Sequence, residues 1–411
     1  MPCTISYGAD STLDLDLPPE ALLASCLQPR GEPLDDPAAA MAAALGGPLD
    51  FPPLAKARVP GDKIVLALDG GLPQPGSLLA PLVDYLIEAG AAASDLTVLR
   101  NRSDADAVAE DVRSQLPAVW RDEIAWEAHD PAAKAQLGLL GASHEGRPIH
   151  LNRTLLDADL VVPLGCLHAE DSLGYHGRYG GLFPAFADQK TIERYRKPRG
   201  DAARRGVDES QRKEIDEIGW LLGSQFSVQI LPGAGDGLLA VLAGDTHGVF
   251  EHGQRLFEAA WRLDVPRKAS LVVAAVSGGP GMQTWDNLGR ALANARRAVA
   301  EGGAIALCCE LNVAPGPAVA GLRQTDDGQA VLRRIRRDCP PDALVAAEII
   351  ETAARARIYL LSQLDESTVE ELGLAPVSAP SDLKRLARRH ESCIVLANAQ
   401  NVQVQVGDER W

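Results

Sequence analysis

Short apolar runs alternate with amphipathic segments along this chain, in the order typical of parallel strands joined by helices. Residues 63–68 contain an apolar run that predicts a buried parallel strand. Apolar residues then recur with helical spacing over residues 76–89, and residues 95–100 predict the next strand. Together these segments predict a βαβ unit, whose crossover is expected to be right-handed.

A second series of the same kind begins near residue 266. Residues 269–276 predict a buried strand, residues 287–300 a helix, and residues 304–308 the following strand. The remaining elements expected here are helices at 342–362 and 382–390 and strands at 393–397 and 402–406. We therefore expect an α/β fold with two domains, residues 1–265 and 266–411, mainly parallel sheets and a cleft between them.

The first domain is expected to begin with a β-hairpin over residues 3–17, followed by a short helix opened by Pro18-Pro19-Glu20. A second helix is expected at 36–45. Further helices are predicted at 104–116, 193–217 and 250–263, and further strands at 124–128, 147–152, 158–163, 226–231 and 237–243. The last two strands flank residues 233–237, Gly-Ala-Gly-Asp-Gly, which we interpret as a turn; a phosphate-binding loop is the alternative.

The segment from Gly165 to Pro184 combines two histidines, two carboxylates, a thiol, an arginine and five glycines directly after a predicted strand. Ligands of α/β proteins bind at the carboxyl ends of strands, and glycines allow the backbone to approach them closely. The segment, called the glycine-rich loop below, is therefore the main candidate for a ligand site.

Several side chains of the loop have more than one interpretation. A carboxylate beside an imidazole would orient it and raise its pKa, which makes His168, Glu170, Asp171 and His176 candidates for a rebuilt catalytic site. Cys166 and the two histidines also offer metal donors. The alternative for all of them is to cap backbone groups or to face water.

Other candidates lie outside the loop or at its end. Asp69 follows a predicted strand and suits either a ribose hydroxyl or a turn beside two glycines. Arg178, Arg196 and Arg290 suit either a pocket for a small anion or separate solvated positions.

Charge and composition narrow the range of partners. The formal net charge is −16, which argues against nucleic-acid binding and against an anionic membrane surface, although a small anion still fits a local positive pocket. No apolar run approaches the roughly 20 residues that span a membrane. Seven scattered cysteines and an N-terminus without a leader pattern predict reduced thiols and a cytoplasmic protein.

A set of short motifs recurs in a familiar order along almost the whole chain. They are Tyr7-Gly8, Leu17-Pro18-Pro19, Asp36-Pro37, Asp69 after a strand, Asn152-Arg153, Phe183-Pro184 closing the loop, Thr191-Ile192, Ser277-Gly278-Gly279 and Gly302-Gly303. In this order and spacing the chain resembles the nickel-dependent lactate racemase (LarA-like) family. The resemblance implies two α/β domains that close over a nickel pincer nucleotide, and racemisation or epimerisation of 2-hydroxy acids.

The resemblance also implies a set of site residues. The family's second catalytic histidine falls on Glu170 or, with a small shift, on His168, so these two residues are the catalytic candidates; the positions that bind substrate fall near Asn287 and Arg290. Asp69, Gly174, Gly177 and Pro184 fall at positions that contact the cofactor.

The chain departs from the family pattern at the positions that carry its chemistry. The cofactor-phosphate arginine falls on Leu72 and the first catalytic histidine falls on Asn101. The lysine that tethers the cofactor falls on Gly180, and the nickel-ligating histidine falls on Arg196. Asparagine has no titratable side chain to act as a base, arginine is a poor metal ligand, and glycine cannot form the tether.

Three hypotheses follow. The first is a racemase or epimerase of 2-hydroxy acids or sugar acids with altered or lost dependence on the pincer nucleotide. The second is an inactive member of the family that binds a small anion or a nucleotide. The third hypothesis is a different chemistry that uses the His168–Glu170–His176 group.

Overall fold

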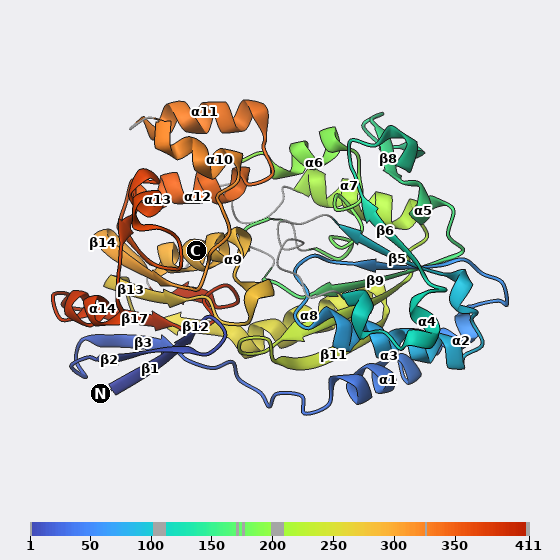
Figure 1. Cartoon of the computed structure of the whole chain (residues 1–411), viewed down its shortest axis with the longest axis horizontal. Helices are drawn as coiled ribbons and strands as arrows, with labels where there is room; N and C mark the ends of the chain where they lie inside the picture. The colour runs from blue at the N-terminus through green and yellow to red at the C-terminus, as the bar shows by residue number, and fades with distance from the viewer. Residues whose placement is uncertain are drawn as a thin grey trace.

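The computed structural model describes residues 2–101, 112–169, 172–174, 177–198, 209–324 and 327–407. Two six-stranded sheets form its framework, with strand orders β11-β10-β9-β4-β5-β6 and β16-β15-β14-β13-β17-β3. The sheets lie beside one another, each flanked by helices, and the N-terminal hairpin packs beside the second sheet (Figure 1). A mainly parallel α/β architecture is thereby confirmed.

The first sheet consists of β4 (Ile64–Leu68), β5 (Leu96–Asn101), β6 (Ala125–His129), β9 (Leu160–Cys166), β10 (Phe226–Pro232) and β11 (Leu238–Asp245). Its neighbouring strands are parallel except for the β10–β11 hairpin, which confirms the predicted turn at residues 233–237. Helix α3 (Pro75–Glu88) connects β4 to β5 and confirms the predicted βαβ unit.

Side chains on the two faces of the first sheet alternate as parallel strands between helices require. Ile64, Leu66 and Leu68 of β4 belong to the core formed with α1 (Pro37–Gly46) and α3. Helix α1 begins where Pro37 follows Asp36, whose carboxylate accepts a hydrogen bond from the Ala39 amide at 3.0 Å. The opposite face, which carries Val65 and Ala67, packs against Leu182 of the glycine-rich loop and against Phe186 just beyond it.

The second sheet consists of β3 (Leu22–Cys26), β13 (Ala269–Ala275), β14 (Val299–Cys308), β15 (Arg357–Leu361), β16 (Ala375–Pro376) and β17 (Cys393–Leu396), all parallel. Helices around it include α9 (Trp285–Ala298), α10 (Pro317–Ala320), α11 (Gly328–Asp338), α12 (Ala343–Ala353), α13 (Glu366–Glu371) and α14 (Pro380–Ala387).

The remaining elements connect or extend the two sheets. A hairpin pairs β1 (Pro2–Tyr7) with β2 (Ser11–Asp16), and β12 (Arg262–Val265) pairs with β18 (Gln403–Val406). The others are α2 (Leu54–Ala57), α4 (Ala118–Arg121), β7 (Leu137–Ala142), β8 (Pro148–Asn152), α5 (Arg153–Leu156), α6 (Gln189–Arg196), α7 (Glu209–Leu221) and α8 (Thr246–Trp261).

Three sequence predictions need correction. The segment after Pro18-Pro19 forms no helix; it leads into β3, which pairs with β17 of the second sheet. The hairpin also packs against that sheet, so the N-terminal residues 2–26, which were predicted within the first domain, contact the second sheet. Local periodicity cannot identify the distant strand with which a short apolar segment pairs.

The third correction concerns residues 342–362, which were predicted to form one helix. They form α12 and then β15, because Arg357-Ile-Tyr-Leu-Leu361 adds a parallel strand beside β14. In the same way, residues at the end of the predicted helix 250–263 form β12. Most of the predicted helix 104–116 lies outside the described residues, and residues 112–115 form a 3₁₀ turn.

None of the described helices is long and apolar enough to cross a membrane.

Candidate ligand-binding pocket

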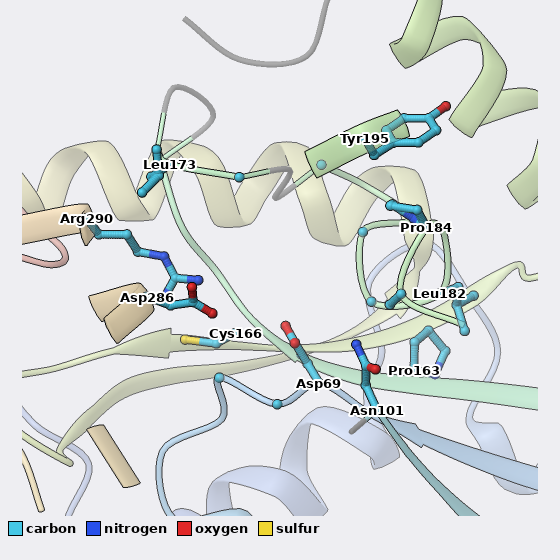
Figure 2. A pocket seen from close by; sticks show the side chains of 18 of the residues that line it. Asp69, Asn101, Pro163, Cys166, Leu173, Leu182, Pro184, Tyr195, Asp286 and Arg290 are labelled. Carbon is cyan, nitrogen blue, oxygen red and sulfur yellow. The ribbon is translucent and has the colours of Figure 1, made fainter. Parts of the chain in front are cut away.

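A pocket of about 280 Å³ lies at the carboxyl ends of the strands of the first sheet. Its wall contains the glycine-rich loop, the end of α6, and the first turns of α9 and α12, which flank the second sheet. The pocket thus lies between elements of both halves of the chain, and Figure 2 shows Arg290 and Asp286 facing Asp69 and Asn101 across it.

The pocket floor is a row of residues at one level of four neighbouring strands. Leu68 pairs with Arg100 and with Leu164, and Gln229 pairs with Gly165, so the next residues of β4 and β5 reach the same level. Asn101, Asp69, Gly165 and Gln229 therefore form one line across β5, β4, β9 and β10, called the polar row below. All four line the pocket.

The polar row arises because the side chains on the loop-facing side of β4 and β5 change from apolar to polar near the carboxyl end of each strand. On this face Leu99 of β5 and Ala67 of β4 belong to an apolar cluster with Leu182. Two residues later each strand carries Asn101 or Asp69 instead. The apolar part holds the loop against the sheet, and the polar part is left to face the cavity.

Asp69 is fixed in a turn at the floor. Its amide donates to the Leu164 carbonyl at 3.0 Å, and its carboxylate interacts with the amides of Gly70, Gly71 and Cys166. Burial raises the pKa of Asp69, while the Arg290 guanidinium and the three amides lower it and so oppose that rise in part. Asp69 therefore both forms the turn expected from the sequence and lines the pocket.

Cys166 lies beside Asp69 in the same floor (Figure 2). Burial, reinforced by the Asp69 carboxylate and opposed by Arg290, raises the pKa of the Cys166 thiol to about 12. Because the thiolate is the nucleophile and the metal ligand, this thiol is unsuited to either role at neutral pH.

Helix α9 positions the basic wall of the pocket. Thr284 caps the helix by accepting a hydrogen bond from the Asn287 amide at 3.2 Å. The Asn287 side chain donates to the Met282 carbonyl at 2.9 Å and accepts from Nη1 of Arg290 at 2.8 Å. Arg290 is thereby held over the floor, and its buried Nε has no hydrogen-bond partner among the described residues.

Two glycines allow the glycine-rich loop to pack closely against helices of both halves. A Cβ on Gly289 of α9 would lie 2.9 Å from Cδ2 of Leu173, and one on Gly219 of α7 would lie 2.4 Å from the Tyr179 ring. Next to Tyr179, Nη1 of Arg178 lies 3.5 Å from a carboxylate oxygen of Asp216 on α7. The loop is thus anchored at both ends.

The pocket is positively charged in a strongly acidic chain. Arg178, Arg196 and Arg290 line it, against the two carboxylates Asp69 and Asp286 among the described lining residues. Arg196 ends helix α6, which Asp188 caps by accepting from the amides of Lys190 and Thr191. The three arginines predicted as a possible anion site therefore share one cavity.

The structure brings most of the predicted site residues to this pocket. Gly174, Gly177 and Pro184 of the loop line it, as do Asp69, Asn287 and Arg290. His168 is not part of the wall: it is 5% exposed, and a Cβ on Gly71 would lie 3.8 Å from its Nε2. Glu170, Asp171 and His176 lie outside the described residues.

Sequence reasoning missed several wall residues, chiefly Ser227 and Gln229 of β10 and Tyr195 of α6. The signal for the first two was present, because polar residues at 227 and 229 alternate with Phe226, Val228 and Ile230 in one strand. Tyr195, whose hydroxyl donates to Glu214 at 2.7 Å, has no comparable local signal.

The residues of the pocket do not fit the nickel pincer nucleotide that the family resemblance implies. No lysine occurs among the described lining residues, and Gly180 and Arg196, which the resemblance aligns with the tether lysine and the nickel-ligating histidine, both line the pocket. No group of three or more His, Cys, Asp or Glu side chains suited to a metal ion forms within the described part of the chain. A guanidinium that stays protonated cannot replace an imidazole as a ligand.

Comparisons with known proteins agree with the fold. A comparison with curated protein sequences finds no match. The lactate racemase apoprotein from Thermoanaerobacterium thermosaccharolyticum superposes with a TM-score of 0.80 at 16% identity, covering 98% of this chain and 100% of that one. A Thermotoga maritima protein superposes with a TM-score of 0.63 at 14% identity, covering 92% and 99%.

At these identities the superpositions establish the fold alone. The family evidence comes from the sequence: residues 7–198, which include β4, β5, β9 and the glycine-rich loop, match the lactate racemase N-terminal domain. Residues 7–198 are thus similar to the lactate racemase N-terminal domain, and the chain as a whole shares the fold of the lactate racemase apoprotein.

Proposed function

We propose that this protein binds a small organic anion of the 2-hydroxy-acid class in the pocket, without a tethered nickel pincer nucleotide. The observation that carries the proposal is the convergence of Arg178, Arg196 and Arg290 on one cavity of a chain whose net charge is −16. The match to the lactate racemase N-terminal domain supports the substrate class, and the residues at positions 180 and 196 argue against the tether and the nickel ligand.

Arg290 is the expected anchor for the ligand carboxylate. A planar guanidinium matches a carboxylate in a bidentate arrangement, and its fixed fork loses little freedom on binding. Asn287 holds one end of that fork through the 2.8 Å hydrogen bond to Nη1. The acidic surface favours a small ligand that enters the local positive field over a large polyanion, which the rest of the molecule would repel.

Calorimetric titration of the purified protein with L- and D-lactate tests this proposal. Saturable heat with a one-to-one stoichiometry is expected for at least one enantiomer. Chloride and acetate at matched ionic strength serve as controls, because nonspecific screening of the arginines would give the same heats with all of these anions. Flat titrations with both lactate enantiomers and with the larger 2-hydroxy acids glycerate and gluconate would contradict the proposal.

A racemase or epimerase of 2-hydroxy acids is the second candidate, favoured by Asp69. A buried carboxyl with a raised pKa beside an arginine is a candidate for exchanging a proton with a ligand hydroxyl. Incubation of the protein with one lactate enantiomer, followed by chiral chromatography, is the assay. Protein expressed together with cofactor-synthesis proteins should be assayed in parallel, because activity only in that preparation would contradict independence from the nucleotide.

A further inference from the structure

The part of the pocket wall formed by strand β10 contains polar atoms without partners among the described residues. Ser227 is 1% exposed and lines the cavity, yet its hydroxyl has no hydrogen-bond partner among the described residues. Oε1 of Gln229, two residues along the same strand, is buried and equally unpartnered in the described part of the chain. Buried polar groups in native proteins nearly always have partners, so two such groups on one pocket wall indicate ligand contacts.

The position of these two side chains in β10 is not explained by packing. Phe226, Val228 and Ile230 point to the opposite face of the sheet and belong to its core. A strand that served only to close the core would not need Ser227 and Gln229 on the face that carries Ala67 and Leu99 in the neighbouring strands.

The polar row extends the same surface toward β5. Between Asp69 and Gln229 lies Gly165, where a Cβ would approach Oδ2 of Asp69 to 3.7 Å, so the absence of a side chain leaves the floor open at this point. Asn101 then continues the row beyond Asp69 (Figure 2). Hydroxyl, amide and carboxylate groups along one line are suited to a ligand with several hydroxyl groups, each of which both donates and accepts.

The size of the pocket agrees with a ligand larger than lactate. A cavity holds one water in roughly 10–15 Å³. About 280 Å³ therefore leaves much more space than a three-carbon acid occupies.

We infer that the preferred ligand is a polyhydroxylated carboxylic acid, whose carboxylate contacts Arg290 and whose hydroxyl-bearing chain lies along Ser227, Gln229, Asp69 and Asn101. This inference rests on the proposed function, because it names the substrate class of the same pocket.

Titration with lactate, glycerate and gluconate, which carry successively more hydroxyl groups, tests it. We expect affinity to increase along the series, with gluconate at least tenfold tighter than lactate. Gln229→Met keeps the shape of the side chain but removes its amide, and Ser227→Ala removes the hydroxyl. Each is expected to weaken gluconate binding about tenfold and to change lactate binding less than twofold.

Gln405→Met is the matched control, since Gln405 lies exposed on strand β18, and it should leave all three titrations unchanged. Equal wild-type affinity for lactate and gluconate would overturn the inference while leaving the proposed function intact. If Gln229→Met weakened lactate binding as much as gluconate binding, the inference would also be overturned and the proposed function would stand. Absence of binding by all three acids would overturn the proposed function itself, and the inference with it.

Discussion

Removing the charge of Arg290 should weaken the binding of any small carboxylate to this pocket. Arg290→Gln keeps a polar side chain but cannot form the charged fork. Among the described residues it disturbs the hydrogen bond to Asn287 and the attraction between the guanidinium and the Asp69 carboxylate. The substitution therefore tests the anchor of the proposed ligand with little damage to helix α9, which Thr284 caps independently.

The magnitude follows from the surroundings of the guanidinium. A unit charge pair at 4 Å is worth about 4 kcal/mol at an effective dielectric constant of 20, which is a ceiling before desolvation is counted. Hydrogen bonds that involve a charged group contribute about 1.5–3 kcal/mol net. We therefore expect the dissociation constant to rise about 10- to 150-fold.

The assay is calorimetric titration of wild type and Arg290→Gln with the tightest-binding acid at constant ionic strength. Arg267→Gln is the matched control, because Arg267 is an exposed arginine outside the pocket. A loss below threefold in Arg290→Gln, or an equal loss in both variants, would refute the assignment of Arg290 as the carboxylate anchor.

Three further predictions follow from the same geometry. Because burial raises the pKa of Asp69 in the folded state, folding free energy is lost as the pH rises from the unfolded-state pKa, about 3.9, through the folded pKa. Asp69→Asn should therefore resist urea better than wild type at pH 8, and the gain should shrink as the pH falls toward about 4. A pH-independent difference would contradict this cause. With a pKa of about 12, the Cys166 side chain is a thiolate in roughly one molecule in ten thousand at pH 8. Peptide mass spectrometry should therefore show that iodoacetamide alkylates Cys166 far more slowly than free cysteine. Comparable rates would refute the argument that burial protects the thiol. The Glu348 side chain is 1% exposed, and its carboxylate lies 2.6 Å from Nε of Arg296, which links α12 to α9. In urea titrations, Glu348→Ala should lower the free energy of unfolding by about 3–5 kcal/mol, because it removes the buried carboxylate that pairs with Arg296. A loss under about 1 kcal/mol would show that the pair contributes little.

Regular elements of this fold follow closely from the sequence, because strong local patterns specify them. The run at residues 64–68, the helix capped by Asp36 and the turn between β10 and β11 all form as predicted. The failures occur where distant partners decide the outcome. Residues 22–26 become a strand only because β17 offers an open edge for them.

The candidate pocket was predictable in location but not in composition. Glycines and charged residues after β9 mark the loop, and the match to the lactate racemase N-terminal domain agrees with that placement. The polar row was not predictable, because it depends on the register of four strands that are far apart in the chain. The burial of His168 away from the cavity likewise depends on the path of the turn around Gly71.

The central proposal is that this protein, whose residues 7–198 match the lactate racemase N-terminal domain, binds a small organic acid without a tethered nickel nucleotide. Intact-protein mass and metal analysis, on protein isolated from its native cell or expressed together with cofactor-synthesis proteins, tests it most directly. We predict that the measured mass equals that of the unmodified 411-residue chain and that the nickel content is far below one ion per chain. A covalent nucleotide adduct with one nickel ion per chain would contradict it.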